Sequence, residues 1–448
     1  MSYMSNAVPL IILATASIAS AQSFDELIAQ GIEQGESYYL DAALASFARA
    51  RDLDPGSATA SYWLGRIYMS MSTPGEDAAM DSAEVYFQRA FDLDPGSALV
   101  NEGMARLLWA QDDLDEAFEY IDRALELDPD LVEGHITRAR LLSWREDFEA
   151  AVSELDQALA LDPDDANAHM YMGMVLYQAG EPTEAYAELE TAVDLSPRCA
   201  PAYRYMGFIL GDQGQNVQAI DYFSASIEID PSEADTYLGR GVIYWFLFQD
   251  EEALADFNEA LRLDPGLAAA MFSRSLIRAD AGQYDAALAD LNEAIRIDPM
   301  FDDAIYERGY VYSLQAEDAR DDDEYLALME KAIQDYTWAL DVNPSYMDVY
   351  AARGMAYYRT GRYAEAADDF QSGIDLAPDV ADLHYLLGRA HFEIQDYEAA
   401  VADFTRAIEL DPENGEDYFS RACAYSALGE DRLAADDLEK AEALGVTE

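Results

Sequence analysis

Small and large apolar residues recur along the chain with a period of 34 residues. In the unit Ala234–Leu267, Tyr237 and Gly241 lie four residues apart, and Ala253 and Phe257 repeat the same spacing further on. This rhythm is typical of one face of an α-helix. An Asp-Pro pair then ends the second apolar stretch, because proline disfavours helical geometry in the residue before it. The pattern predicts two helices in each unit.

Prolines mark the ends of successive units. From Pro95 to Pro299 they recur every 34 residues, whereas the interval Pro55 to Pro95 is 40 and the interval Pro299 to Pro344 is 45. A fixed period of this length is the signature of a stacked repeat array. Once the 6 and 11 extra residues are set aside, the chain after Ser23 divides into twelve units of 34.

The two long intervals are predicted to hold insertions between the helices of their units. The register places the first near residues 72–77, in a Pro-Gly turn, and the second near residues 315–323. Eleven residues are close to three helical turns, so the second insertion can lengthen its helices without rotating their faces. Insertions in repeat arrays often lie on the binding face.

We number the residues of each unit from 1 to 34, so that its proline is position 32. Three positions then hold side chains of nearly constant size in every unit. Position 20 is alanine, position 24 is large and mostly aromatic, and position 8 is often glycine, as at Gly241. Two helices approach closely only where a small residue faces a large one. A glycine in mid-helix costs about 1 kcal/mol relative to alanine, so its recurrence indicates close packing.

This pattern resembles the tetratricopeptide repeat (TPR) family over the chain from Phe24 onward. The resemblance implies an all-α fold, a right-handed α-solenoid of about twelve tandem 34-residue helix-turn-helix repeats. We predict a single solenoid over residues 22–448, whose first helix begins with a capping box between Ser23 and Glu26.

Residues 1–21 are predicted to be a cleavable signal peptide. Ala7–Ala19 is an apolar run of 13 residues, too short to span a membrane, and an Ala-Ser-Ala cleavage pattern follows it. Cleavage is expected after Ala21, giving a periplasmic or secreted protein whose mature form does not insert into membranes. No lysine or arginine precedes the apolar run, which departs from the usual signal and leaves a retained anchor as the alternative.

The chain has a formal net charge of −62 and only two lysines, Lys331 and Lys440. A surface this acidic repels nucleic acid and anionic lipid, so neither is expected as a partner. The acidity either serves solubility or suits basic partners. The two cysteines, Cys199 and Cys423, fall in distant repeats and are not expected to pair.

No motif of an enzyme or cofactor site is present, so we expect neither catalysis nor a cofactor. The chain has no phosphate-binding loop, zinc-protease motif or nucleophile elbow. His384 and His391 share a helix face, but their repeat positions favour packing over metal binding, and His135 and His169 are interpreted in the same way. The acidic run Asp321–Glu324 lacks the spacing of a calcium loop and is interpreted as a helix start.

The family resemblance implies that positions 2, 5, 9, 12 and 13 of each unit line a concave surface. Here these positions are rich in aromatic residues and arginine, the types enriched at interface hot spots. The candidate partner-binding residues are Tyr62, Arg66, Arg106, Trp109, Arg140, Trp144, Tyr177, Arg204, Trp245, Phe246, Arg359 and Arg389. Arginines in so acidic a chain suit a partner with carboxylates among apolar side chains. Packing between neighbouring first helices is the alternative explanation of these residues.

The predicted function is that of a non-enzymatic scaffold or adaptor of the cell envelope, binding a peptide or protein segment that is extended or helical. The clearest sequence evidence for such binding lies in the seventh unit, Ala234–Leu267, because Tyr244–Phe248 is apolar around the whole circumference of its helix. Two alternatives remain: a regulatory or carrier subunit of an envelope polysaccharide or assembly complex, and direct binding of glycans. The lysine-based carboxylate clamp known in the family is missing.

Overall fold

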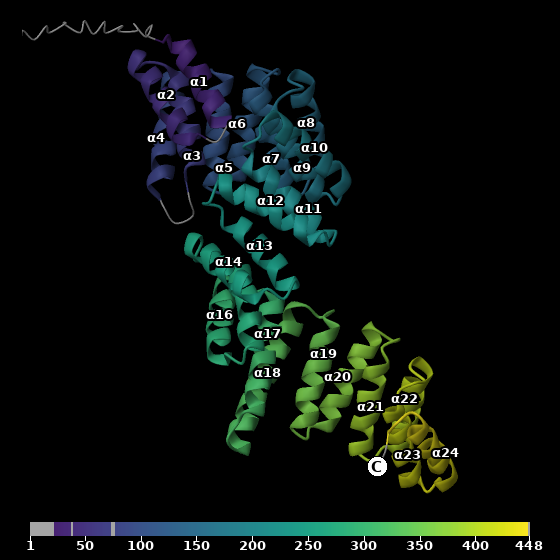
Figure 1. Ribbon diagram of the computed structural model, residues 1–448. Coiled ribbons are helices and arrows are strands. Elements are labelled where there is room, and N and C mark those ends of the chain that lie inside the picture. The colour runs from purple at the N-terminus through teal and green to yellow at the C-terminus, as the bar shows by residue number, and fades with distance from the viewer. Residues whose placement is uncertain (1–21, 37–38, 73–76, 447–448) are drawn as a thin grey trace, which may run out of the picture. The chain divides into compact units, whose positions relative to one another are not determined.

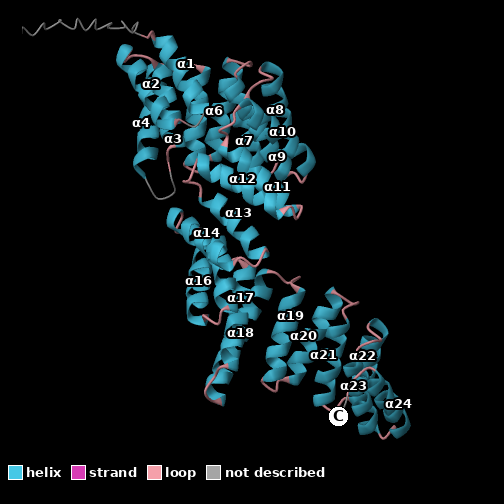
Figure 2. Cartoon of the chain, in the orientation of Figure 1, coloured by secondary structure: helices cyan, strands magenta, loops and turns pink. Residues whose placement is uncertain are grey.

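The computed structural model describes residues 22–36, 39–72 and 77–446, so the predicted signal peptide lies outside the described residues. Over these ranges the chain forms 24 helices, paired into twelve helix-turn-helix repeats (Figure 1). Every regular element of the described part is an α-helix (Figure 2). The structure confirms the all-α TPR solenoid predicted from the 34-residue period.

The chain divides into two compact units, Met1–Ser232 and Glu233–Glu448. The N-terminal unit contains α1 (Phe24–Glu36), α2 (Leu40–Leu53), α3 (Ala58–Ser70), α4 (Asp77–Leu93), α5 (Ala98–Ala110), α6 (Leu114–Leu127), α7 (Val132–Trp144), α8 (Phe148–Leu161), α9 (Ala166–Gln178), α10 (Pro182–Leu195), α11 (Ala200–Asp212) and α12 (Asn216–Ile229). The C-terminal unit contains α13 (Ala234–Phe246), α14 (Asp250–Leu263), α15 (Ala268–Asp280), α16 (Tyr284–Ile297), α17 (Asp302–Glu317), α18 (Asp322–Val342), α19 (Met347–Arg359), α20 (Tyr363–Leu376), α21 (Ala381–Glu393), α22 (Tyr397–Leu410), α23 (Gly415–Leu428) and α24 (Asp431–Ala443). Whether residues 22–448 form one uninterrupted solenoid stays a prediction.

The turn between repeats is built by its own side chains. After α2 ends, Asp54 accepts a hydrogen bond from the backbone N–H of Gly56 at 3.0 Å. Ser57 then caps α3 by accepting from the N–H of Ala60 at 3.2 Å. The Asp-Pro-Gly-Ser sequence therefore ends one helix and begins the next. At the start of α1, the Glu26 N–H donates to Ser23 Oγ at 3.2 Å and the Ser23 N–H to Glu26 Oε2 at 2.8 Å, which confirms the predicted capping box.

Within each repeat, the two helices meet where glycine faces a large ring. A Cβ atom added to Gly241 would lie 2.7 Å from Cε1 of Phe257, and one added to Gly388 would lie 2.8 Å from Cδ1 of Phe404. Both phenylalanine side chains are buried. Only a residue without a side chain allows this approach, so the small-against-large prediction is confirmed.

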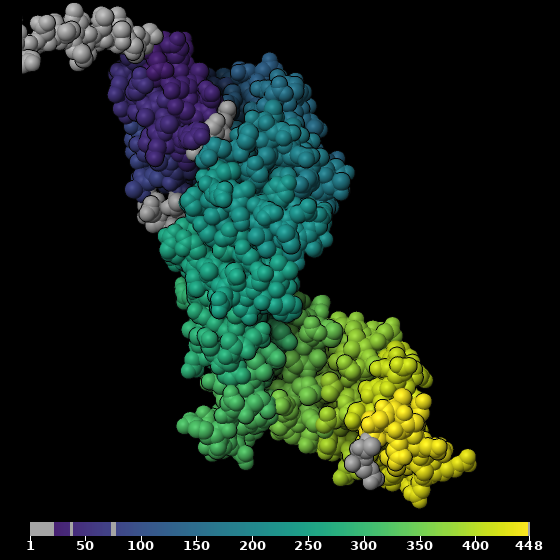
Figure 3. Space-filling view, in the orientation of Figure 1, coloured from purple at the N-terminus to yellow at the C-terminus, as the bar shows by residue number. Residues whose placement is uncertain are grey.

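In most repeats the first helix also packs on a first helix beside it. In the N-terminal unit α3 contacts α5, α5 contacts α7, α7 contacts α9 and α9 contacts α11. In the C-terminal unit α13 contacts α15, α15 contacts α17 and α21 contacts α23. We call each set of first helices the first-helix layer of its unit. Side chains fill the spaces between the ribbons of each unit (Figure 3).

Much of the extra sequence in the two long repeats is helical. Helix α4 has 17 residues, compared with 14 in α6, and residues 73–76 of the first insertion lie outside the described part. Helices α17 and α18 have 16 and 21 residues, compared with 13 and 14 in α15 and α16. Asp321 caps α18 by accepting from the Glu324 N–H at 2.9 Å, so the acidic run is a helix start, as interpreted from sequence.

Candidate functional site

A buried carboxylate joins three neighbouring first helices of the N-terminal unit. Glu102 on α5 accepts hydrogen bonds from the Tyr62 hydroxyl on α3 at 2.7 Å and from Thr137 Oγ1 on α7 at 2.5 Å. Nε of Arg106, one turn further along α5, donates to the same carboxylate. Burial alone would raise the pKa of Glu102, but Arg106, Arg66 and these hydrogen bonds hold it below its usual value. Glu102 is therefore a fully satisfied anion.

Arg140 on α7 lies beside this cluster, but its guanidinium contacts aromatic rings instead of a carboxylate. The carbon of its guanidinium lies 4.4 Å from the ring centre of Trp109 and 4.7 Å from that of Tyr171. Within the described residues it has no hydrogen bond or ion pair with another side chain. Burial, followed by the charges of Arg106 and Arg66, lowers the pKa of Arg140 to about 10. Arg140 is thus a cation without an adequate counter-charge.

An exposed indole adjoins the Arg140 site. Trp144, at the end of α7, is 62% exposed and meets Trp109 edge-on, with ring centres 6.3 Å apart. Arg66 on α3 lies over the Trp63 ring at 4.9 Å and donates to the Tyr62 hydroxyl at 3.4 Å. The structure therefore brings six of the predicted site residues into one region of the first-helix layer, on α3, α5 and α7.

Two of these six residues are not available to a partner. Tyr62 is completely buried and Arg106 is only 7% exposed, because both are bonded to Glu102. Their prediction as partner-contacting residues is corrected, and they hold the layer together instead. Sequence reasoning missed Glu102 and Tyr171; the signal for Glu102 was a lone carboxylate at position 5 of an otherwise apolar helix face.

The remaining predicted arginines and Tyr177 lie elsewhere. Tyr177 on α9 donates to Asp212 at 2.7 Å, and Arg204 on α11 lies over the Tyr205 ring at 5.6 Å. In the C-terminal unit, Arg359 forms an ion pair with Glu317 at 2.6 Å. Arg389 lies over the Tyr358 ring at 4.7 Å and donates to its hydroxyl at 3.0 Å. Arg359 is therefore already paired, unlike Arg140.

A second exposed aromatic group lies at the end of α13. Trp245 and Phe246 have ring centres 5.1 Å apart, and Phe246 is 59% exposed. The helix ends at Phe246, so the expectation that Tyr244–Phe248 is wholly helical is wrong. Phe248 lies in the turn and is 92% exposed.

The backbone of Phe248 is left-handed, with φ of 58°. Among the described residues, position 15 has a positive φ in nine repeats, and five of them place glycine there: Gly180, Gly214, Gly282, Gly361 and Gly429. A bulky residue is strained in this conformation, and strained residues cluster at functional sites. Phe248 combines strain with almost complete exposure, which fold stability does not explain.

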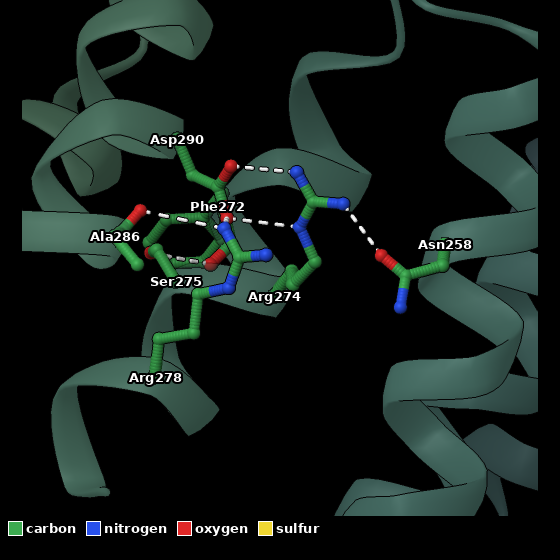
Figure 4. Close-up of polar contacts among 7 residues, drawn as sticks. All are labelled: Asn258, Phe272, Arg274, Ser275, Arg278, Ala286 and Asp290. Carbon is green, nitrogen blue, oxygen red and sulfur yellow. Dashed lines mark hydrogen bonds and ion pairs between the residues drawn. The ribbon is translucent and has the colours of Figure 1, made fainter. Parts of the chain in front are cut away.

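A ladder of arginine–aspartate pairs joins the two helices of five repeats in the C-terminal unit. Arg274 on α15 donates two hydrogen bonds to Asp290 on α16, at 2.9 and 2.6 Å, and a third to Asn258 on α14 at 2.6 Å (Figure 4). Arg278 donates to the same aspartate at 2.6 Å. The same two-pronged pairs recur at Arg240–Asp256, Arg308–Asp335, Arg353–Asp369 and Arg421–Asp437. These arginines are structural and are not available to a partner.

The first-helix layer of the C-terminal unit carries an acid, Glu307, that has no hydrogen bond or ion pair within the part of the chain that the structure describes. Glu307 on α17 is half-buried, and burial together with the charge of Asp280 on α15 raises its pKa to about 7. The sign of the uncompensated charge is therefore opposite to that at Arg140.

The histidines are structural, as their repeat positions predicted. His135 bonds to Glu154 at 2.7 Å and to the Pro129 carbonyl at 2.9 Å. His391 bonds to Asp403 at 2.6 Å. His135, His169 and His391 are thus each held by the second helix of their own repeat, whereas His384 bonds to the Pro378 carbonyl at 3.0 Å.

Comparisons with known families agree with this architecture. Tetratricopeptide repeat families match residues 39–76, 76–141, 145–206, 234–267, 276–315, 328–381 and 381–414. Together these segments cover well over half of the chain. The chain is a tetratricopeptide repeat protein. This family consists typically of non-enzymatic scaffolds that bind other proteins.

Several solved TPR structures match the chain at low sequence identity. The Cut9–Hcn1 hetero-tetramer of the APC/C matches with 15% identity and a TM-score of 0.46, covering 94% of this chain and 96% of that one. YrrB, a TPR protein with an unusual peptide-binding site, has 26% identity and a TM-score of 0.31, covering 41% of this chain and 95% of its own. A Parabacteroides merdae TPR protein has 16% identity and a TM-score of 0.41, covering 62% and 98%. No curated protein sequence matches the chain significantly.

Proposed function

We propose that this TPR protein is an exported, non-enzymatic scaffold of the cell envelope that binds an extended or helical segment of a partner protein on its first-helix layers. In the described part of the chain, no helix is both long enough and apolar enough to cross a membrane. Export rests on the leader-like residues 1–21, which lie outside the described part.

The observation that carries the binding role is Phe248. Its ring is 92% exposed on a backbone with φ of 58°, where glycine would avoid both the strain and the exposed apolar surface. Phe246, next to it, is 59% exposed. Large aromatic side chains are the commonest anchors of protein interfaces, and exposed apolar groups of this kind mark interaction sites. A partner segment that covers the two rings accounts for both features.

Variants at position 15 test this proposal. Phe248→Gly removes the ring and the strain together, and Gln395→Gly relieves the same left-handed backbone, with φ of 66°, without removing an aromatic group. Partner proteins are cross-linked in intact cells that express either variant, and the captured proteins are identified by mass spectrometry. We expect partners that the Gln395→Gly protein retains to be lost with Phe248→Gly. Identical capture by both variants would contradict a role for this surface.

Export is tested separately by sequencing the N-terminus of the protein recovered from the envelope and the medium. A mature chain beginning at Gln22 supports the proposal. A chain that is found only inside the cell and retains residues 1–21 contradicts it.

A further inference from the structure

We propose that Arg140 is the centre of a carboxylate-binding site for peptides, in which Trp109 and Tyr171 hold its guanidinium and the exposed Trp144 takes a neighbouring apolar side chain. The inference rests on the proposed protein-binding function and names the chemistry that the N-terminal unit recognises. The carboxylate comes from an Asp or Glu side chain or from a peptide C-terminus, which share the same chemistry.

The geometry leaves the hydrogen-bonding edge of Arg140 free. The ring centres of Trp109 and Tyr171 lie 4.4 and 4.7 Å from the guanidinium carbon, distances that are typical of cation–π contacts. Such contacts hold the plane of the guanidinium but use none of its N–H donors. Arginine presents these donors in a fixed fork that matches a carboxylate. In the described part of the chain, no acceptor takes a hydrogen bond from them.

The nearby acids are committed to other groups. Glu102 accepts from Arg106, Tyr62 and Thr137, which leaves it satisfied without Arg140. The carboxylate of Asp165 caps α9 by accepting from the Ala168 N–H at 2.7 Å. The charge of Glu133 helps to raise the pKa of Arg66, but Glu133 forms no ion pair with Arg140 in the described residues. An incoming carboxylate therefore supplies the counter-charge that the fold does not give to Arg140.

The surroundings also restrict the ligand. The chain as a whole carries a formal charge of −62, which repels polyanions such as nucleic acids. A single carboxylate beside an apolar side chain escapes most of this repulsion and gains contact with Trp144, which is 62% exposed. An acidic residue next to a large apolar residue, or an apolar residue at a free C-terminus, meets both requirements.

The test begins with random peptides displayed on phage and selected on the purified protein. Selected sequences are synthesised with a free C-terminal carboxylate, as C-terminal amides, and with Asn or Gln in place of Asp or Glu, and their Kd values are measured by calorimetry. We expect enrichment of acidic–apolar sequences. Neutralising the critical carboxylate should weaken binding about tenfold or more, the loss of one charge-assisted hydrogen bond. The amide and the Asn/Gln peptides show which carboxylate is bound.

Variants then assign the effect to Arg140. Arg140→Met should weaken binding of the acidic peptide about tenfold and leave its neutral analogue unaffected. Arg140→Glu should bind a Lys-substituted peptide better than the acidic one. The matched control is Arg145→Met, which removes an arginine at the end of the same helix whose partner is Asp115 at 2.6 Å. It should leave the Kd unchanged.

Thermal unfolding separates this role from a structural one. Because Arg140 lacks a counter-charge in the fold, Arg140→Met should keep or raise the Tm. Peptides that bind without carboxylate preference, or equal binding by Arg140→Met, would overturn the carboxylate site while leaving the scaffold function intact. Selection of no peptide at all, or binding of glycans alone on a glycan array, would overturn both.

Discussion

Arginine has different roles in the two units of this protein, although both units are built from the same repeat. In the C-terminal unit, arginines at position 7 donate to aspartates at position 23, as Arg274 does to Asp290. In the N-terminal unit Arg66, Arg106 and Arg140 occupy position 9, and of these three only Arg106 has a carboxylate partner in the described residues. Arg138 is the one arginine at position 7 of this unit, and it lies 3.5 Å from the position-23 Glu154. A shift of two residues along the first helix thus takes an arginine away from the position-23 aspartate that pairs with position 7.

The partner position explains the difference. All six second helices of the C-terminal unit carry aspartate at position 23: Asp256, Asp290, Asp335, Asp369, Asp403 and Asp437. The N-terminal unit has Ser, Tyr or Glu there, and mostly apolar residues at position 7, such as Met172 and Met206. The position-9 arginines of this unit therefore contact residues of the first helices rather than a position-23 aspartate. The comparison teaches that pairing within a repeat, not arginine content, decides which surface keeps an unsatisfied charge.

The largest effect is expected from breaking the ladder. Asp290→Ala removes the carboxylate acceptor of both Arg274 and Arg278 and should lower the free energy of unfolding of the C-terminal unit by about 3 kcal/mol, because it leaves two half-buried cations without a counter-charge. Hydrogen exchange of α15 and α16, together with urea unfolding, measures the loss. Glu188→Ala, at the same position in the N-terminal unit, should cost much less because Glu188 is 32% exposed and, among the described residues, bonded only to His169. Equal costs would contradict the comparison.

A smaller effect, the same in both units, is expected from the packing that they share. Gly241→Ala and Gly207→Ala each place a Cβ within 2.9 Å of a phenylalanine ring, Phe257 or Phe223. Each should destabilise its unit by about 1–3 kcal/mol, the usual cost of overpacking. Urea unfolding of the two variants measures this cost. Relief of the Gly241→Ala defect by Phe257→Leu would identify the ring as the cause, whereas a cost in one unit only would show that the units pack differently.

The unpaired acid of the C-terminal unit predicts a pH dependence. The pKa of Glu307 is raised from 4.5 to about 7 by burial and by Asp280, so the folded state holds this proton more tightly than the unfolded chain. The resulting stability is complete below the unfolded pKa and is lost as the pH rises through the folded value. Glu307→Gln should therefore be more stable than wild type above about pH 7, by about 1–2 kcal/mol after solvent screening, and the difference should vanish in mild acid. Unfolding midpoints across this pH range measure it, and a difference independent of pH would refute the assignment.

The smallest effect is a gain in stability. Phe248→Gly should stabilise the C-terminal unit by about 0.5–1 kcal/mol, because glycine adopts a positive φ without strain. Thermal unfolding of Phe248→Gly and Gln395→Gly compares the two sites. Destabilisation by Phe248→Gly would show that the ring supports the fold, which its 92% exposure does not suggest.

Much of the candidate site was visible in the sequence, but its chemistry was not. The positions of Arg140, Trp109 and Trp144 follow from the repeat register. The burial of Tyr62 does not, because it depends on Glu102, which lies 40 residues further along the chain. Register shows which face a residue occupies, whereas its exposure depends on what the neighbouring repeats place against it.

The sequence by itself determined the helix pairs, their turns and the glycine–aromatic contacts, because each depends on residues within one 34-residue unit. Only the tertiary structure decided which charges are satisfied. The acceptor of Thr137 lies 35 residues away on another repeat, and Asn258 and Arg274 come from different repeats as well. Charge pairing depends on distances of a few ångströms between repeats, and a repeat pattern places residues on a face without setting those distances. Arg140 therefore looked like Arg106 in the sequence, yet only Arg106 found a carboxylate in the fold.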